Sequence, residues 1–480
     1  MVWTGMEQLS VKLLRFLVAL VMARLLTPSD YGMVGMLSIF LAIAWTFLDS
    51  GIGSALIQKK DRTDEDYSTA FYFNFAVGVS FYALLFAAAP WIAAFYGVPE
   101  LTSITRVISL GLLTSSLCTV QMTRLTVNLR FGAQSAIAVS ALAVSSVLGI
   151  FLAYRGYGAW ALVWQILLSD AINVCLLWIV SGWRPKLVFS VQSFRRLFGF
   201  GSKLLCSTLI DTVYGNLYTL VIGKMFGSAS LGFYSRANGF AVLPSDTVTS
   251  VVLKVNYPIL SRFQDDSQML VSACRRLVRL PMFVLAPMLF GLAVMAEPLV
   301  KVLIGDKWLP CVPLLQVLCL GVLWNPLAQL NLNLLCVKGR TDLVLKLELV
   351  KKLIAFAFLV ATVPFGVFWM CVGLVAYNFI ALCINCRYAK KMLGFGFFAQ
   401  MREVIPVILN AAAMAGLAAL AMRLSAVPLV QLALAVGMGA CSYILGALAY
   451  GEESLPYVVQ TLRGLLKRGG GKDSPGVRPR

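Results

Sequence analysis

Residues 24–32 read Arg-Leu-Leu-Thr-Pro-Ser-Asp-Tyr-Gly and join one long apolar run of the chain to the next. About 200 residues further along, residues 224–232 join two other apolar runs and read Lys-Met-Phe-Gly-Ser-Ala-Ser-Leu-Gly. Both junctions have a basic residue, two apolar residues, a short polar turn and a closing glycine. Internal repetition of this kind is typical of transporters built from two related halves, so the sequence predicts two related membrane lobes.

The composition excludes a soluble protein. Of the 480 residues, 60% are hydrophobic and 13% are charged, whereas soluble domains have about 45–50% apolar residues. We therefore predict an all-α polytopic membrane protein. The net charge of +19 raises the alternative of nucleic-acid binding. We reject a nucleic-acid partner because the cations lie in short segments between apolar runs, where membrane topology accounts for them. No small-residue cleavage site follows the first run, so we expect no cleavable signal peptide.

The charge pattern predicts how the chain crosses the membrane. A spanning helix needs about 20 mostly apolar residues, and the chain has about 14 such runs. Cations such as Lys59, Arg195 and Lys338 concentrate in every second connection, which is the expected pattern if those connections and both termini are cytoplasmic. The predicted spans are approximately 6–26, 33–57, 69–96, 103–128, 134–154, 157–181, 199–223, 236–260, 279–300, 309–337, 343–363, 367–389, 403–423 and 426–450.

Further matches between the halves set the predicted domain organisation. Counterparts stay about 200–215 residues apart, so the first six and the next six spans are predicted to form two pseudo-symmetric six-helix lobes. Six helices return the chain to its starting side, which makes the repeats parallel. We predict an N-lobe at 1–181, an amphipathic cytoplasmic linker at 182–202, a C-lobe at 203–393, two extra helices at 394–450 and a basic cytoplasmic tail at 451–480.

Residue types exclude several chemistries. The chain has no histidine, which removes histidine proton relays, histidine-ligated metals and histidine-dependent acyl transfer. The 11 cysteines mostly lie in apolar runs and are interpreted as small buried hydrophobic residues. Cys383 and Cys386 have CxxC spacing but fall within a predicted span and lack a second pair. We therefore predict no metal site, no cofactor and no enzymatic activity.

Four stretches together resemble a known family. They are 24–32, 49–58 (Asp-Ser-Gly-Ile-Gly-Ser-Ala-Leu-Ile-Gln), 222–237 and 257–264 (Tyr-Pro-Ile-Leu-Ser-Arg-Phe-Gln). As a set they resemble the bacterial polysaccharide transporters, in particular Wzx-type exporters of the colanic-acid kind, over about residues 1–400. That family belongs to the superfamily of the multidrug (MATE) antiporters and the lipid II flippase.

The resemblance implies a function that composition alone does not give. It implies an alternating-access flippase of the bacterial inner membrane whose cargo is an undecaprenyl-pyrophosphate-linked oligosaccharide. The products would be exopolysaccharide, O-antigen or capsule. Coupling to H⁺ or Na⁺, contact with membrane lipids and a polysaccharide polymerase or co-polymerase partner are further implications.

A flippase needs cations for a pyrophosphate and hydroxyls, amides or aromatic rings for sugars. Charged residues inside spans are costly, so each is a candidate site residue. Lys12 and Arg15 share one helical face, although both also lie where a side chain can snorkel to the cytoplasmic surface. The other substrate-binding candidates are Lys203, Asp211, Tyr214 and Tyr218 on one face of the seventh span, Arg124 in the fourth, and Gln329 and Asn333 in the tenth.

Several of these assignments have structural alternatives. Amides and acids in membranes also join helices, so Gln329, Asn333 and Asp211 are open to a packing role. Asp49 and Asp246 occupy roughly matching places in the two repeats and are candidates for ion coupling or for local pairing. Asp170 is a lone acid within the sixth span.

Two other functions compete with the flippase. A small-molecule antiporter has the same architecture but predicts drug resistance and a compact acid cluster. A membrane glycan polymerase predicts a long outward loop that carries catalytic residues, and no outward connection is long enough.

Overall fold

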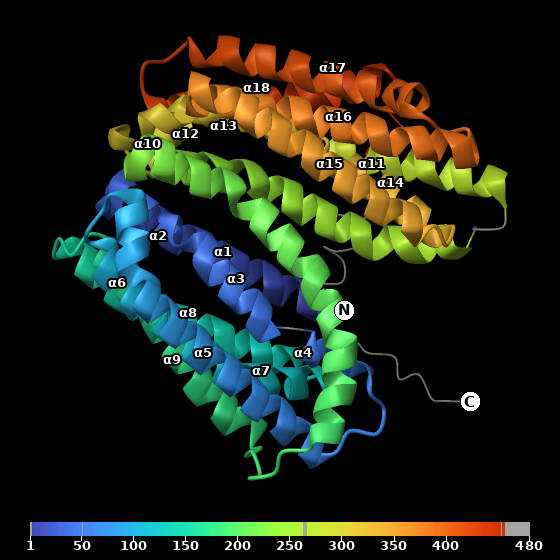
Figure 1. The fold of residues 1–480 in the computed structure, drawn as a ribbon. Coiled ribbons are helices and arrows are strands. Elements are labelled where there is room, and N and C mark those ends of the chain that lie inside the picture. Colours follow the sequence, from blue (N-terminus) through green and yellow to red (C-terminus); the bar gives the residue numbers. More distant parts are fainter. Residues whose placement is uncertain (1, 50, 263–265, 453, 457–480) are drawn as a thin grey trace, which may run out of the picture. The chain divides into compact units, whose positions relative to one another are not determined.

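The structure is a computed structural model that describes residues 2–49, 51–262, 266–452 and 454–456. Every regular element among these residues is a helix (Figure 1). The elements are α1 (Val2–Leu25), α2 (Pro28–Met36), α3 (Ser38–Asp49), α4 (Ile52–Gln58), α5 (Asp64–Tyr96), α6 (Leu101–Ile108), α7 (Leu110–Val127), α8 (Phe131–Tyr154), α9 (Ala159–Ser181), α10 (Val191–Arg262), α11 (Ser267–Val294), α12 (Ala296–Leu303), η1 (Asp306–Cys311), α13 (Val312–Val322), α14 (Asn325–Val337), α15 (Thr341–Thr362), η2 (Val363–Phe365), α16 (Val367–Leu393), α17 (Phe397–Met422) and α18 (Pro428–Ala449).

The predicted all-α polytopic class is confirmed. Within the described part of the chain, 11 helical segments are long and apolar enough to cross a membrane. Two further predicted spans coincide with α1 and α15, which carry more charges, and residues 205–250 are counted as one segment although two spans are predicted there. The number of fourteen spans stays a prediction.

Helix α10 contains a sharp kink at Gly227, where φ is 81° and ψ is 176°. A positive φ of this kind favours glycine because other residues clash with their own backbone. The kink divides α10 into two helices and lies inside the second repeated junction, residues 224–232. The polar turn predicted from the sequence is therefore a kink between two helices without an intervening loop.

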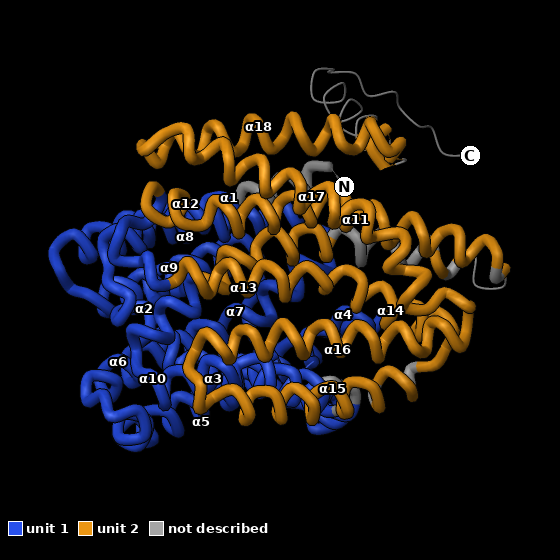
Figure 2. The backbone as a smooth tube through the Cα atoms, turned by 90° about the horizontal axis from the view of Figure 1, so that it is seen from above, with its two compact units in different colours: residues 1–236, 303–310 blue, residues 237–302, 311–480 orange. Residues whose placement is uncertain are grey.

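The chain forms two compact units (Figure 2). Unit 1 comprises residues 1–236 and 303–310, and unit 2 comprises residues 237–302 and 311–480. The domain organisation stays a prediction: the two six-helix lobes, the linker and the pair of extra helices. Residues 457–480, most of the predicted tail, lie outside the described residues.

A capping box explains how the first repeated junction turns the chain. The N–H of Asp30 donates to Thr27 Oγ1 (3.3 Å), and the N–H of Thr27 donates to Asp30 Oδ2 (2.8 Å). Pro28 occupies the first turn of α2, where its fixed φ suits a helix and no hydrogen-bond donor is needed. Together these features end α1 and start α2 within a few residues.

The two repeated junctions cross each other within unit 1. A Cβ atom on Gly32 would lie 1.7 Å from the carbonyl oxygen of Ser228, and one on Gly232 would lie 1.9 Å from the carbonyl oxygen of Pro28. Gly32 and Gly232 are counterparts in the repeat, and so are Pro28 and Ser228. Each glycine contacts the counterpart residue of the other junction, so the two contacts are reciprocal. The hydroxyls of Ser29 and Ser228 are also hydrogen-bonded, at 2.7 Å. The internal repeat seen in the sequence is thus a close backbone contact in space.

Candidate transport cavity

Unit 1 contains an open cavity of about 880 Å³ that is lined by residues of α1, α3, α4, α7, α8 and α9. Figure 1 shows α7, α8 and α9 running alongside one another, with α3 and α4 nearby. All residues that line the cavity belong to unit 1. They are Arg15, Trp45, Asp49, Gly53, Ser54, Ile57, Thr114, Ser115, Cys118, Thr119, Met122, Thr123, Thr126, Ala138, Leu142, Ser145, Gln165, Ile166, Ser169, Asp170, Asn173 and Leu177.

Helix α7 contributes a row of hydroxyls to this cavity. Thr119, Thr123 and Thr126 each donate a hydrogen bond to the carbonyl four residues earlier in their own helix, at 2.9–3.1 Å. A hydroxyl has one proton and two lone pairs, so these bonds use the proton and leave the oxygen as an acceptor. The wall therefore presents mainly hydrogen-bond acceptors, which suit the O–H donors of a sugar.

Helix α9 contributes amides and an acid. Asn173 donates from its amide nitrogen to the carbonyl of Ser169 (2.9 Å), and Gln165 donates to the Ser146 hydroxyl (3.4 Å). The carboxylate of Asp170 lies against Gly111 of α7, where a Cβ atom would lie 3.2 Å from Asp170 Oδ2. The glycine at position 111 thus gives the carboxylate its room beside α7.

Three charged residues face the cavity from three helices. Arg15 comes from α1, Asp49 from the end of α3 and Asp170 from α9. If all three are ionised, the lining carries one positive and two negative charges. Arg15 and Asp49 are exposed and Asp170 is half-buried, so Asp170 has the lowest effective dielectric constant around it. This wall therefore suits a neutral or cationic group better than an isolated anion, except beside Arg15.

The predicted site residues separate into several places. Arg15 and Asp49 line the cavity, together with Asp170, which the sequence left as a lone acid. Lys12 is exposed on α1 and is not part of the lining. The side chain of Lys203 lies outside the described residues.

The remaining candidates on α10 do not line the cavity. Asp211 is exposed, Tyr214 is half-buried and Tyr218 is buried. The contacts between α10 and α3 use other residues of α10: Thr212 is hydrogen-bonded to Thr46 (2.9 Å) and Asn216 accepts from Ser38 (3.3 Å). Asp246 lies in the part of α10 that belongs to unit 2 and is exposed.

Arg124 lies in an aromatic contact away from the cavity lining. Its guanidinium carbon is 5.4 Å from the ring centre of Tyr67 and 5.5 Å from that of Trp183. Cations over aromatic faces are stabilised by the ring quadrupole. This placement favours a structural role for Arg124, and its contact with a substrate stays a prediction.

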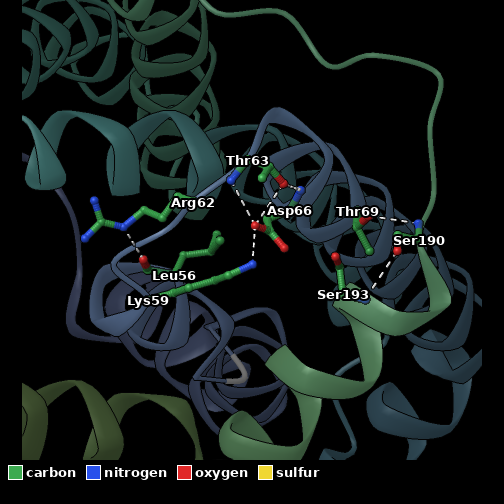
Figure 3. A network of polar contacts seen from close by, with 8 residues as sticks. All are labelled: Leu56, Lys59, Arg62, Thr63, Asp66, Thr69, Ser190 and Ser193. Atoms are coloured by element: carbon green, nitrogen blue, oxygen red, sulfur yellow. Dashed lines mark hydrogen bonds and ion pairs between the residues drawn. The ribbon is translucent and has the colours of Figure 1, made fainter.

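A polar network beside Arg124 holds the segment after α9 against α5 (Figure 3). The buried carboxylate of Asp66 accepts from the N–H and hydroxyl of Thr63 and pairs with Lys59. The backbone N–H of Ser190 donates to Thr69 Oγ1, and the N–H of Lys186 donates to Ser68 Oγ, both at 3.0 Å. The start of α10 is therefore fixed to the first turns of α5.

The polar residues predicted on α14 lie in unit 2. Gln329 is exposed and Asn333 is half-buried. Asn331 is fully buried instead and exchanges hydrogen bonds with Gln400 of α17 at 3.0 and 2.8 Å. Reciprocal amide bonds of this kind join helices in membranes. Their presence at Asn331 supports the packing interpretation for this part of α14.

Sequence reasoning missed the hydroxyl row of α7. The signal was the recurrence of Ser115, Thr119, Thr123 and Thr126 at helical spacing. Arg124, on the same helix, was singled out instead because charges are costlier in a membrane. Hydroxyls that bond to their own helix are not costly, so their burial gives a weak sequence signal.

Comparisons with known proteins extend this description. Residues 21–313 match the model of a family described as "Polysaccharide biosynthesis protein". The chain is 26% identical over 458 residues to the teichuronic acid biosynthesis protein TuaB of Bacillus subtilis (strain 168), covering 92% of this chain and 93% of TuaB. It is 25% identical over 352 residues to the lipopolysaccharide biosynthesis protein WzxC of Escherichia coli (strain K12), covering 72% and 70%.

A solved structure shares the fold. The inward closed conformation of the lipid II flippase MurJ superposes with a TM-score of 0.77 at 12% sequence identity, covering 94% of this chain and 99% of that chain. The sequence matches confirm the predicted resemblance to Wzx-type polysaccharide biosynthesis proteins, and the MurJ match shows a shared fold. They also agree with the prediction of a transporter rather than an enzyme.

Proposed function

Because the chain belongs to the polysaccharide biosynthesis protein family, we propose that it is a flippase that moves a lipid-linked oligosaccharide across the membrane by alternating access. It is a multi-pass membrane protein with the fold of a flippase. The cargo is an oligosaccharide on undecaprenyl pyrophosphate, and the membrane is the bacterial inner membrane, with both termini cytoplasmic. The positive-inside pattern of the sequence supports this orientation.

The cavity of unit 1 is the observation that carries the proposal. Its volume of about 880 Å³ falls within the roughly 300–1,000 Å³ range of small-molecule sites. Its lining combines hydroxyl oxygens, two amides and Trp45, which are groups that hydrogen-bond to sugars or stack on them. A cavity with this lining inside a membrane unit offers a polar route to the sugar while the lipid tail stays in the bilayer.

The pyrophosphate requires a cation, and Arg15 is the cation of this lining. A guanidinium binds phosphate oxygens through two parallel hydrogen bonds. Asp49 and Asp170 disfavour an anion beside them. We therefore assign the sugar to the α7 and α9 walls and the pyrophosphate to the Arg15 side.

A deletion strain tests the proposal. Its lipids are extracted, the undecaprenyl-linked glycans are identified by mass spectrometry, and their leaflet is determined with a membrane-impermeant glycan-modifying reagent. Complete repeat units trapped on the cytoplasmic side are the expected result. Truncated or unpolymerised units on the outer side would point to an enzyme and would contradict a flippase.

A second function is favoured by one observation: two carboxylates, Asp49 and Asp170, line the same cavity. Paired intramembrane acids can bind H⁺, Na⁺ or an organic cation, so an ion-coupled antiporter is the alternative. Proteoliposomes with imposed pH or Na⁺ gradients distinguish the two. Gradient-driven uptake of a small cation that is lost in Asp170→Asn, with an unchanged glycan-lipid pool in the deletion strain, would favour the antiporter.

A further inference from the structure

Residues 303–310 form a short strap that belongs to unit 1, although the chain on both sides of it belongs to unit 2. The strap leads from α12 into η1. Within the strap, Trp308 has 0% of its surface exposed and is among the largest fully buried side chains of the described residues. A polar-tipped aromatic side chain at such a position needs a partner for its N–H.

Trp308 and Lys307 cap the end of α1. The indole N–H of Trp308 donates to the carbonyl of Ala23 (2.8 Å), and the Lys307 ammonium donates to the carbonyl of Arg24 (2.7 Å). The last carbonyls of a helix have no partner within the helix. The strap therefore supplies donors to the end of α1 from a distant part of the sequence.

The ring of Trp308 contacts both repeated junctions. Its centre lies 5.6 Å from the ring of Tyr31, in the first junction, and 6.1 Å from the ring of Phe233, directly after the second. Both contacts are edge-to-face, at 71° and 89°. The guanidinium of Arg236 lies 3.8 Å from the ring centre of Tyr31 and 5.9 Å from that of Trp308. One side chain thus connects the two segments where they cross.

Further contacts make the crossing closely packed. Leu231 of the second junction has 0% of its surface exposed, and a Cβ atom on Gly35 of α2 would lie 3.3 Å from Leu231 Cδ2. The hydroxyls of Ser29 and Ser228 add a hydrogen bond. A closely packed contact of this kind changes only as a whole, between discrete arrangements. Trp308 adds a buried hydrogen bond and two ring contacts to it.

We propose that Trp308, assisted by Lys307, is a latch that holds the two repeated junctions crossed, and that the transport cycle requires this latch to release. Trp308 is a positioning residue because it acts through the junctions and not through the cargo. This role depends on the proposed flippase function only for the transport cycle. The closed crossing itself is a property of the fold.

Alkylation of a cysteine placed in the crossing tests the latch without any cargo. Ser29→Cys is introduced alone, and modification of its peptide by a maleimide is followed by mass spectrometry, which separates it from the native cysteines. Trp308→Ala is expected to raise the modification rate about ten-fold, because the loss of one buried hydrogen bond and its packing changes an opening equilibrium by that order. Trp308→Phe, which keeps a ring and loses the N–H, is expected to have a smaller effect.

The matched control on the same strap is Asp306→Asn, which alters an exposed residue and should leave the rate unchanged. If Trp308→Ala does not fold, Trp308→Phe and Lys307→Ala carry the test. Equal modification rates in these folded variants and in the parent protein would overturn the latch.

A reversible cross-link tests the requirement for release. Ser29→Cys with Ser228→Cys places two thiols at a site where the native hydroxyl oxygens are 2.7 Å apart. Oxidation is expected to stop glycan export, and a reductant is expected to restore it. The control pair is Asn410→Cys with Gly446→Cys, which joins α17 to α18, where a Cβ on Gly446 would lie 2.0 Å from Asn410 Oδ1.

The outcomes separate the two proposals. Undiminished export by the oxidised 29–228 pair would overturn the requirement for release. A deletion strain without trapped glycans would overturn the flippase function, while the alkylation rates would still decide whether Trp308 holds the crossing.

Discussion

Gly32 and Ser228 touch through their backbones, so that any side chain at position 32 would overlap the Ser228 carbonyl: a Cβ there would lie 1.7 Å from that oxygen. The reciprocal contact joins Gly232 to Pro28. The two repeated junctions can therefore cross this closely because each has a glycine, which has no side chain, at the contact.

Gly32→Ala is expected to destabilise the protein by about 2 kcal/mol or more, because an overpacked backbone contact must open to admit the methyl group. The measurement is the thermal unfolding temperature in detergent, which is monitored by size-exclusion chromatography with fluorescence detection. Gly239→Ala is the matched control, since it is also helical and a Cβ there meets nothing within 4 Å. That control should be neutral or slightly stabilising. Equal unfolding temperatures for the two variants would contradict the close crossing.

Arg15→Gln is expected to lower glycan export about ten-fold or more at normal expression, because Arg15 is the cation of the cavity lining and a charge-assisted hydrogen bond to phosphate is lost. Export is measured as surface polysaccharide in a complemented deletion strain. Lys12→Gln, one helical turn earlier and outside the lining, is the control and should export normally. A larger defect in Lys12→Gln would place the pyrophosphate outside this cavity.

Glu452→Gln is expected to lower the free energy of unfolding by about 1–3 kcal/mol, because Arg279 loses its nearest carboxylate partner and keeps the more distant Glu403, 3.9 Å away. The Glu452 carboxylate is fully buried and lies 2.8 Å from Nε of Arg279, which is itself partly exposed. The measured quantity is the unfolding temperature. Glu297→Gln breaks an exposed pair with Lys301 and should change stability by less than about 1 kcal/mol. Similar shifts for both would argue against a special role of the buried pair.

Ser68→Ala combined with Thr69→Val is expected to release the segment after α9. The substitutions remove the acceptors of the Lys186 and Ser190 N–H groups, at a cost of about 1 kcal/mol for each bond. Trypsin cleavage after Lys186, Arg195 or Arg196 should then become about five-fold faster. Ser80→Ala, whose hydroxyl bonds only within its own helix, is the control. Unchanged cleavage would mean that other contacts fix this segment.

The sequence predicted the helices well because their signal is local. Long apolar runs and the charge bias between them are properties of each segment alone, and the repeat at 24–32 and 224–232 could be read directly. Which face of each helix points inward was much harder to predict. Spans that are apolar all round have almost no amphipathic periodicity, so Arg15 and Asp49 could be placed in a cavity only as candidates.

The contacts of Arg124 and Asp170 could not be read from their own segments. Arg124 drew attention as a cation in a span, but Tyr67 and Trp183 stabilise it by contacts between segments distant in sequence. Asp170 had no partner within its own helix, and its neighbour Gly111 comes from α7. Contacts of this kind depend on how helices pack, which a single sequence without its fold does not specify.

The strap at 303–310 also sets an order for biogenesis. The carbonyls of Ala23 and Arg24 obtain their donors from residues 285 and 283 positions further along the chain. Helix α1 is therefore synthesised long before these two donors, since synthesis proceeds from the N-terminus at about 5–20 residues per second. A ribosome that stalls before residue 307 leaves the carbonyls of Ala23 and Arg24 without the Trp308 and Lys307 donors, which would distinguish an unfinished chain from a complete one.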